Sequence, residues 1–314
     1  MSRRNLLLGL RILAFALVGA CVLLFARRLD RDQLLGAFHR ADLRLLSLAM
    51  LAALPSAALQ GLRWSSLVKA VREVPRLTAV AAMYVGQAAS ALLPMRAGEA
   101  VRTELLARST GLGRAVSLGT VALDHCINAL VMFTIAALLP FLSPMPRWFA
   151  AAVWIGMAGA VTLALVLLRL ARHPEAIGSG RLADIVSRMR WGLVAARNPR
   201  AVAQAAGFAA LSWAFEIAVA MLALAAFHLP HDVAHAMGVL FGVNLALAIP
   251  SPPASLGNFE LGAAFALTAF GGPTEQAAAF AIGYHALQLV PSLVMGGVML
   301  SAFRRPMAAP MMPA

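Results

Sequence analysis

The chain has 314 residues, of which 61% are hydrophobic and only 12% are charged, and its formal net charge is +13. An ordinary soluble domain carries about twice that share of charged residues, so the composition excludes a water-soluble fold. The basic residues lie in short segments between apolar runs, a distribution that argues against nucleic acid as a partner and favours topology signals and contacts with lipid headgroups.

The N-terminal apolar run from Leu6 to Ala26 resembles a signal peptide. No small-residue cleavage site precedes Arg27 and Arg28, so we expect a retained anchor. Cys21 and Cys126 both lie in apolar segments, where a thiol behaves as a small hydrophobic group and no disulfide framework is indicated.

Six stretches are long and apolar enough to cross a bilayer, which takes about 20 residues of helix. They are about 6–26, 45–62, 115–140, 149–168, 201–227 and 277–303. The sequence therefore predicts an all-α polytopic membrane protein whose residues 1–314 form a single integral membrane domain, with approximate halves 1–140 and 149–303.

The distribution of arginine predicts that both termini are cytoplasmic in a bacterial inner membrane, because short cytoplasmic loops are enriched in Lys and Arg. Arginines cluster near the N-terminus, near the C-terminus and between Arg169 and Arg200. The segment 27–44 disagrees, since this topology puts its five arginines outside; an amphipathic helix on the membrane surface would account for it.

Two further apolar stretches are short and broken by proline. Leu77–Leu93 meets Pro94-Met-Arg-Ala-Gly-Glu, and Ala236–Ile249 meets a Pro- and Gly-rich run that ends at Glu260. Irregular backbone at membrane depth survives only where protein or a water-filled cavity satisfies its polar groups. We expect two re-entrant or broken-helix elements, which are the best sequence pointer to a transport site.

The two breaks resemble each other. Pro94 precedes Gly98 by four residues, and Pro253 precedes Gly257 by four. Downstream, His125 lies 31 residues after Pro94, and His285 lies 32 residues after Pro253. With six spans, the first element enters from the cytoplasm and the second from outside, which predicts an inverted repeat.

The first break carries candidate substrate-binding residues: Arg96, Gly98, Glu99 and Arg102. They begin an expected helix whose free N–H groups and positive dipole end suit an anion, and a lipid phosphate is the natural candidate. The alternative is that the arginines only mark a cytoplasmic loop.

Ionisable residues inside predicted spans form a second group of candidates, because a charge at membrane depth is costly unless it is paired or faces a cavity. Asp124 and His125 lie in one span and Glu216 in another. Glu216 would bind a proton or a cationic headgroup; the alternative is a buried neutral acid that donates one hydrogen bond, and for Asp124 a structural pair.

Asn244, Gly257, Glu260 and His285 complete the candidate set in the second half. Glu260 follows the second break and is expected near the start of a helix, where a carboxylate suits the dipole even without a function. His285 is a side chain of a type that titrates near neutral pH.

Signatures of catalysis are missing from the sequence: it has no Cys/His zinc spacing, no Gly-x-Ser-x-Gly turn and no phosphate-binding Gly-rich loop. We therefore expect no cofactor, no metal site and no enzyme activity.

The chain resembles the flippase-like transmembrane domain of lysylphosphatidylglycerol synthases, over most of its length. The resemblance rests on Arg63-Trp64, on Leu93–Glu99 with Arg102, on Trp213 to Glu216, and on the segment 250–260. The chain departs from the family pattern at Asp124-His125 and Asn128, and at His285, where an arginine is usual. It is also similar to stand-alone family members associated with hopanoid lipid pathways.

The resemblance implies a lipid transporter or flippase that moves a polar-headed lipid or lipid-linked precursor between leaflets. The expected partners are membrane lipids with an anionic or zwitterionic headgroup, together with a second copy of the chain or a lipid-biosynthesis enzyme. Loops of at most about thirty residues leave no room for a soluble aminoacyl-transfer domain. The alternatives are a membrane-embedded enzyme that acts on a lipid headgroup and a structural partner of a lipid-modifying complex.

Overall fold

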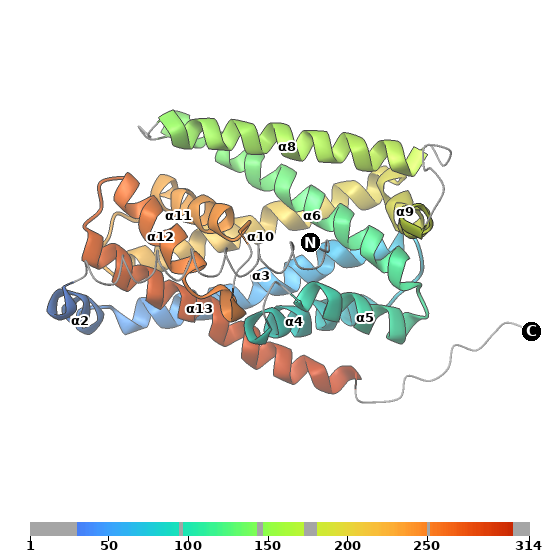
Figure 1. The fold of residues 1–314 in the computed structure, drawn as a ribbon. Coiled ribbons are helices and arrows are strands. Elements are labelled where there is room, and N and C mark those ends of the chain that lie inside the picture. The colour runs from blue at the N-terminus through green and yellow to red at the C-terminus, as the bar shows by residue number, and fades with distance from the viewer. Residues whose placement is uncertain (1–29, 94–96, 143–146, 173–180, 250–251, 304–314) are drawn as a thin grey trace, which may run out of the picture.

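The structure, a computed structural model, describes residues 30–93, 97–142, 147–172, 181–249 and 252–303. Within these ranges the chain is helical and contains no strand. The predicted all-α class is therefore confirmed (Figure 1).

Five of the described helices are long and apolar enough to span a membrane, and each matches a predicted span. They are α3 (Leu43–Lys69), α6 (Arg114–Ala136), α8 (Arg147–Arg172), α10 (Pro199–Ala226) and α13 (Thr274–Leu300). Successive long helices run in alternating directions along one axis (Figure 1). The sixth predicted span, 6–26, lies outside the described residues.

The two broken elements are helical hairpins, each made of two helices that pack against each other. The first hairpin joins α4 (Arg76–Leu92) to α5 (Gly98–Thr110), and the second joins α11 (Val233–Ala246) to α12 (Asn258–Ala269). The chain enters and leaves each hairpin at one end of the bundle, and the two hairpins enter from opposite ends (Figure 1).

Contacts at the hairpin bases support this path. The Arg72 guanidinium, before α4, donates to the Gly111 carbonyl, after α5, at 3.2 Å. The rings of His235, near the start of α11, and Phe270, after α12, are 5.3 Å apart. Each hairpin thus returns to the end where it began, as the re-entrant interpretation expected.

Three short helices connect these elements: α2 (Arg31–His39), α7 (Leu139–Leu142) and α9 (Arg181–Leu193). Helix α2 lies in the arginine-rich segment 27–44 and packs against α13, and Asp30 caps it through the Asp32 amide at 2.9 Å. Helix α9 was not expected from the sequence, which showed only clustered arginines there. Its polar composition lacks an apolar run, so the helix forms because one face packs on α6.

The order of elements recurs along the chain. A short helix, a long helix, a hairpin and a long helix follow one another as α2 to α6 and again as α9 to α13, with α8 between the two sets. Because the hairpins point in opposite directions, the two sets have the arrangement of an inverted repeat.

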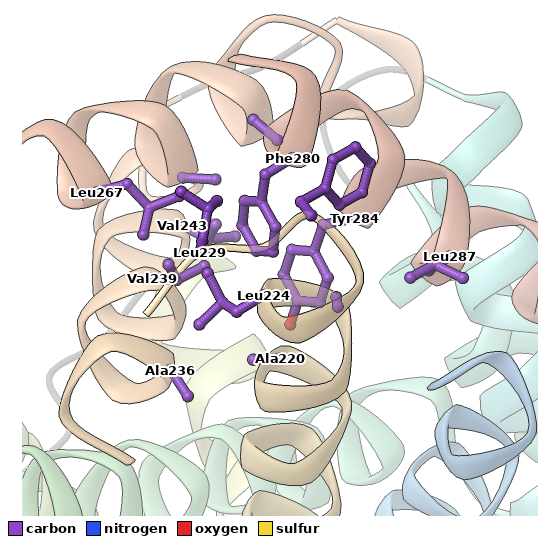
Figure 2. Packing of buried hydrophobic residues seen from close by; sticks show 14 of the residues in the cluster. Ala220, Leu224, Leu229, Ala236, Val239, Val243, Leu267, Phe280, Tyr284 and Leu287 are labelled. Atoms are coloured by element: carbon purple, nitrogen blue, oxygen red, sulfur yellow. The ribbon is translucent and has the colours of Figure 1, made fainter. Parts of the chain in front are cut away.

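Small residues allow the helices to approach closely, which matters because lipid offers no hydrophobic drive for helix association. Ala49 and Ala53 of α3 pack in one cluster with Ala220 and Ala223 of α10. Figure 2 shows how this cluster continues between α10, α11, α12 and α13.

A pair of glycines brings the two helices of each hairpin together. A Cβ on Gly98 would lie 1.8 Å from the Gly86 carbonyl oxygen, and one on Gly262 would lie 2.7 Å from the Gly242 carbonyl oxygen. Neither space admits a side chain, so the glycines fix how deeply each hairpin is folded.

Candidate substrate-binding cavity

A cavity of about 340 Å³ lies where the two hairpin tips meet inside the bundle. Helices α3, α6, α10 and α13 complete its wall. Its polar lining residues are Gln60, Arg63, Tyr84, Gln87, Ser90, Glu99, Arg102, His125, Asn128, Glu216, Asn244, Ser255, His285, Gln288 and Ser292. A neighbouring cavity of about 220 Å³ shares Gln60, Asn128, Glu216, Asn244 and Gln288 with it.

A buried ion pair joins α3 to α6 at the cavity wall. The Arg63 guanidinium donates from Nε to Asp124 Oδ1 at 2.7 Å and from Nη2 to Asp124 Oδ2 at 3.1 Å. It also donates to the Asn128 side-chain oxygen. The side chains of Arg63 and Asp124 are 4% and 0% exposed, so the bidentate geometry offsets the cost of burying both charges.

Arg102 of α5 joins the same cluster from the first hairpin. It donates to Glu99 at 2.6 Å and to Asp124 Oδ2 at 3.5 Å, and it lies 4.9 Å from the Trp64 ring centroid. Trp64 is held in turn by its indole N–H, which donates to Thr120 Oγ1 at 3.0 Å. Aromatic contact and two carboxylates therefore fix Arg102 in place.

The two guanidinium groups of this cluster, Arg63 and Arg102, are balanced by the carboxylates of Asp124 and Glu99. From the sequence, Arg102 was expected to belong to a site for an anionic headgroup. The structure instead gives it carboxylate partners inside the protein, and its residue is only 2% exposed.

His125 lies at the open edge of this cluster. Its Nε2 atom is 3.2 Å from Arg102 Nη2 and 3.2 Å from Glu99 Oε2. An arginine can only donate, while a carboxylate can only accept, so the proton on Nε2 decides which of the two contacts is a hydrogen bond.

Glu216 of α10 has neutral partners. Its carboxyl accepts from Ser56 Oγ at 2.6 Å and from Gln288 Nε2 at 2.9 Å. Gln60 donates to Ser56 at 3.3 Å, and Gln87 of the first hairpin donates to Gln60 at 3.1 Å. Within the described ranges Glu216 makes no ion pair, so this carboxyl faces both cavities uncompensated by a cation.

The second hairpin carries a carboxylate and histidine pair. Glu260, in the first turn of α12, accepts from the Gly257 N–H at 2.7 Å through Oε2, and its Oε1 is 2.7 Å from His285 Nδ1. The Phe259 ring stacks on the His285 ring with centroids 4.3 Å apart. Asn258 donates to the carbonyls at the end of α11, both at 3.2 Å, and so satisfies the backbone at the break.

The structure brings most of the sequence-predicted site residues to one cavity. Gly98, Glu99, Arg102, His125, Glu216, Asn244 and His285 line it. Asp124 and Glu260 are one contact behind the wall, and Gly257 serves as the N-cap of α12 with φ of 86°. Arg96 lies outside the described residues.

Four uncharged polar residues were not predicted from the sequence: Gln60, Gln87 and Gln288, which line the cavity, and Ser56, which bonds to Glu216. A signal was present for α3, because Ser56, Gln60 and Arg63 follow one another at helical spacing and share a face of an otherwise apolar helix. Among the described residues, no group of three or more His, Cys, Asp or Glu side chains is placed to hold a metal ion.

These features define a multi-pass helical membrane protein in which two re-entrant hairpins meet at a polar cavity. The family model of the lysylphosphatidylglycerol synthase transmembrane region matches residues 11–296, so the chain belongs to that family. The resemblance stated from the sequence is confirmed. A search of curated proteins gives no match.

Proposed function

We propose that this protein moves a polar-headed lipid between the two leaflets of the inner membrane. The observation that carries the proposal is the meeting of two oppositely directed hairpins at one polar cavity within an apolar bundle. Transporters bind their substrate where such broken helices meet near the middle of the bilayer, and rocking of one repeat against the other exposes it to each side in turn.

The composition of the wall supports a headgroup as the ligand. Hydroxyl and carboxamide groups from α3, α4, α6, α11 and α13 line the cavity together with Glu216 and would offer hydrogen bonds to a headgroup. A cavity of about 340 Å³ is at the lower end of the size of ligand sites, which suits a headgroup whose acyl chains stay in the bilayer. Anionic and zwitterionic headgroups are the proposed classes.

The distribution of charge supports an orientation. One end of the bundle holds the end of α3, the start of α6, the end of α8 and the helix α9. It carries Lys69, Arg72, Arg76, Arg108, Arg114, Arg169, Arg172, Arg188, Arg190, Arg197 and Arg200. The opposite end carries fewer arginines and several acids, so the first end and both termini are proposed to be cytoplasmic.

Labelling of single cysteines in intact cells tests this orientation. A membrane-impermeant maleimide should modify His231→Cys and should leave Asp184→Cys unmodified until the cells are opened. The reverse result would invert the proposed topology.

Lipid exchange in reconstituted vesicles tests the function. Vesicles of phosphatidylethanolamine and phosphatidylglycerol in equal parts receive either lipid with a fluorophore on one acyl chain, so that the headgroup stays native. Dithionite then quenches the outer leaflet. In protein-free vesicles, dithionite quenches about half of the fluorescence, from the probe in the outer leaflet. With wild-type protein it should quench more than half, and the recovered lipid should be chemically unchanged.

The control is Gln288→Ala, which removes a partner of Glu216 but no charge, and which should slow exchange at equal reconstitution. If both probes stay half protected, as in protein-free vesicles, the proposed function is wrong. If the recovered headgroup is altered, a membrane-embedded enzyme is the better description.

A further inference from the structure

Each hairpin presents a carboxylate to a histidine on the long helix that follows it. In the first, Glu99 Oε2 is 3.2 Å from His125 Nε2, and in the second, Glu260 Oε1 is 2.7 Å from His285 Nδ1. Glu99 and Glu260 both lie in the first turn of the second helix of their hairpin.

The two pairs occupy equivalent places in the two sets of elements. His125 is eleven residues after the first residue of α6, Arg114, and His285 is eleven residues after the first residue of α13, Thr274. Both histidines line the same cavity, and the hairpins that carry their carboxylate partners enter the bundle from opposite ends.

A carboxylate beside an imidazole is a site for a proton. Histidine exchanges protons near neutral pH, and the pair can hold either one proton or two, without any metal. With one proton, a neutral ring shares a hydrogen bond with the carboxylate. A second proton, taken up by the ring, turns this contact into an ion pair that ties the hairpin more strongly to the next helix.

The surroundings of the pairs differ. Among described residues, the charged groups that face the first pair are Arg102 of α5, Asp124 of α6 and, through Asp124, Arg63 of α3. Helix α4 contacts this cluster through Met83, which lies 3.2 Å from Arg102.

The titratable neighbours of the second pair are Tyr284 of α13 and Glu216 of α10, both joined to Gln288, and Tyr84 of α4. Helices α3 and α11 contribute Gln60 and Asn244 to the same cavity. The start of α11 carries His235 and Asp232, which bond each other at the base of the hairpin, and α2 packs on the opposite end of α13 from the cavity.

Accessibility also differs between the pairs. The side chains of Glu99 and His125 are 38% and 46% exposed, whereas those of Glu260 and His285 are 20% and 5% exposed. The first pair is therefore open to exchange of protons in this conformation, and the second is closed beneath Phe259.

We propose that Glu99–His125 and Glu260–His285 are two proton-binding sites, one for each hairpin, and that the movement of protons through them is coupled to lipid exchange. The proposal rests on the proposed transport function and adds the coupling ion. A proton taken up at the accessible pair ties its hairpin to the following helix and closes that pair. The opposite pair opens at the same time, and its proton leaves on the other side.

The first test is the exchange assay described above, carried out with a pH gradient. A gradient of about one unit is a tenfold difference in proton activity and should raise the wild-type exchange rate several-fold over symmetric pH. His125→Gln and His285→Gln should each abolish that increase. His235→Gln is the matched control, because His235 also lies 2.7 Å from a carboxylate, Asp232, but outside the cavity.

Exchange that is equally fast with and without the gradient would overturn proton coupling while leaving lipid transport intact. The same holds if His235→Gln removes the response as completely as His285→Gln does.

A second test does not depend on transport. Ser90→Cys and Ala254→Cys, at the tips of the first and second hairpins, are made separately with Cys21 and Cys126 changed to alanine. Their labelling rates, each divided by the rate of free cysteine at the same pH, are measured between about pH 5.5 and 8. The rates should change with pH in opposite directions, and His125→Gln should flatten the profile at the first tip.

Flat profiles at both tips overturn the proposal even if lipid exchange is observed. Profiles that depend on pH as described, together with no exchange of either lipid, support the proton sites and overturn the transport function.

Discussion

On the wall formed by α3, α5 and α6, carboxylates meet guanidinium groups, whereas on α10 the Glu216 carboxyl meets only a hydroxyl and an amide. Both walls face the same cavity. The first wall has its charges balanced within the protein, and the second leaves a carboxyl with no cationic partner among the described residues.

This difference separates two uses of polar residues at membrane depth. A buried ion pair fixes the relative position of helices, and removal of one partner leaves a charge that nothing compensates. A carboxyl with neutral partners can lose its charge without loss of shape, and it is available to a ligand or a proton. Substitutions on the first wall should therefore lower stability, whereas the loss of charge at Glu216 should lower activity.

The largest effect is expected from Asp124→Ala. This substitution removes the carboxylate partner of the buried Arg63 and one of the two carboxylates that contact the buried Arg102. The loss should cost about 3–5 kcal/mol of stability. Thermal unfolding in detergent should show a large loss, and Asp184→Ala, at an exposed carboxylate, should show none. Joint replacement of Arg63 by Met and Asp124 by Leu should recover part of the loss. A fully stable Asp124→Ala protein would remove the distinction between the walls.

Glycine substitutions compare the two hairpins on the same scale. Gly98→Ala places a Cβ 1.8 Å from a backbone oxygen, and Gly262→Ala places one at 2.7 Å. Both should destabilise, by about 1–3 kcal/mol, and the first substitution should cost more. Thermal unfolding shows which of the two substitutions lowers the stability more. Gly159→Ala is the control, because its Cβ would meet nothing within 4 Å. Equal costs would show that the first hairpin can shift to relieve the clash.

Glu216→Gln should change stability by less than about 1 kcal/mol, because an amide of the same shape can still accept from Gln288 through its oxygen and donate to the Ser56 hydroxyl through its nitrogen. Lipid exchange should nevertheless fall about tenfold, which corresponds to about 1.4 kcal/mol at the transition state. The exchange assay and thermal unfolding on one preparation separate these effects. If exchange is unchanged from about pH 5.5 to 8, Glu216 is a structural residue.

The smallest effect is expected from a half-buried carboxylate of the first hairpin, Glu104, whose arginine partners are exposed. Hydrogen bonds from the Arg114 and Arg108 guanidinium groups hold the pKa of Glu104 at about 2. Since this pKa is lowered in the folded state, the contribution to stability is present above the unfolded value of about 4.3 and is lost as the pH falls toward about 2. Exposure and salt screening make it small. Glu104→Gln should leave the melting temperature at pH 7 unchanged within error; a large shift would mean that surface pairs hold the hairpin base.

The sequence by itself determined the class of the protein and most of its elements. Apolar runs of about 20 residues gave five spans that the structure contains, since the bilayer demands helices of that length. Proline and glycine marked both hairpin breaks, because proline cannot continue the hydrogen-bond ladder of a helix. Glu260 was expected near the start of a helix and is found in the first turn of α12.

Which polar side chains contact each other was decided only by the tertiary structure. Nothing local pairs Arg63 with Asp124, which are 61 residues apart, or links Ser56 to Glu216, which are 160 residues apart. Helix α9 was missed for the same reason, since its stability comes from packing on α6 rather than from its own composition.

The physical reason is that a sequence fixes the spacing of side chains along a helix, whereas the rotation and depth of each helix depend on its neighbours. Those are set by close contacts such as Gly86 on Gly98 and Gly242 on Gly262. Only this packing determines that Arg102 meets two carboxylates while Glu216 meets none of the cations in the described ranges.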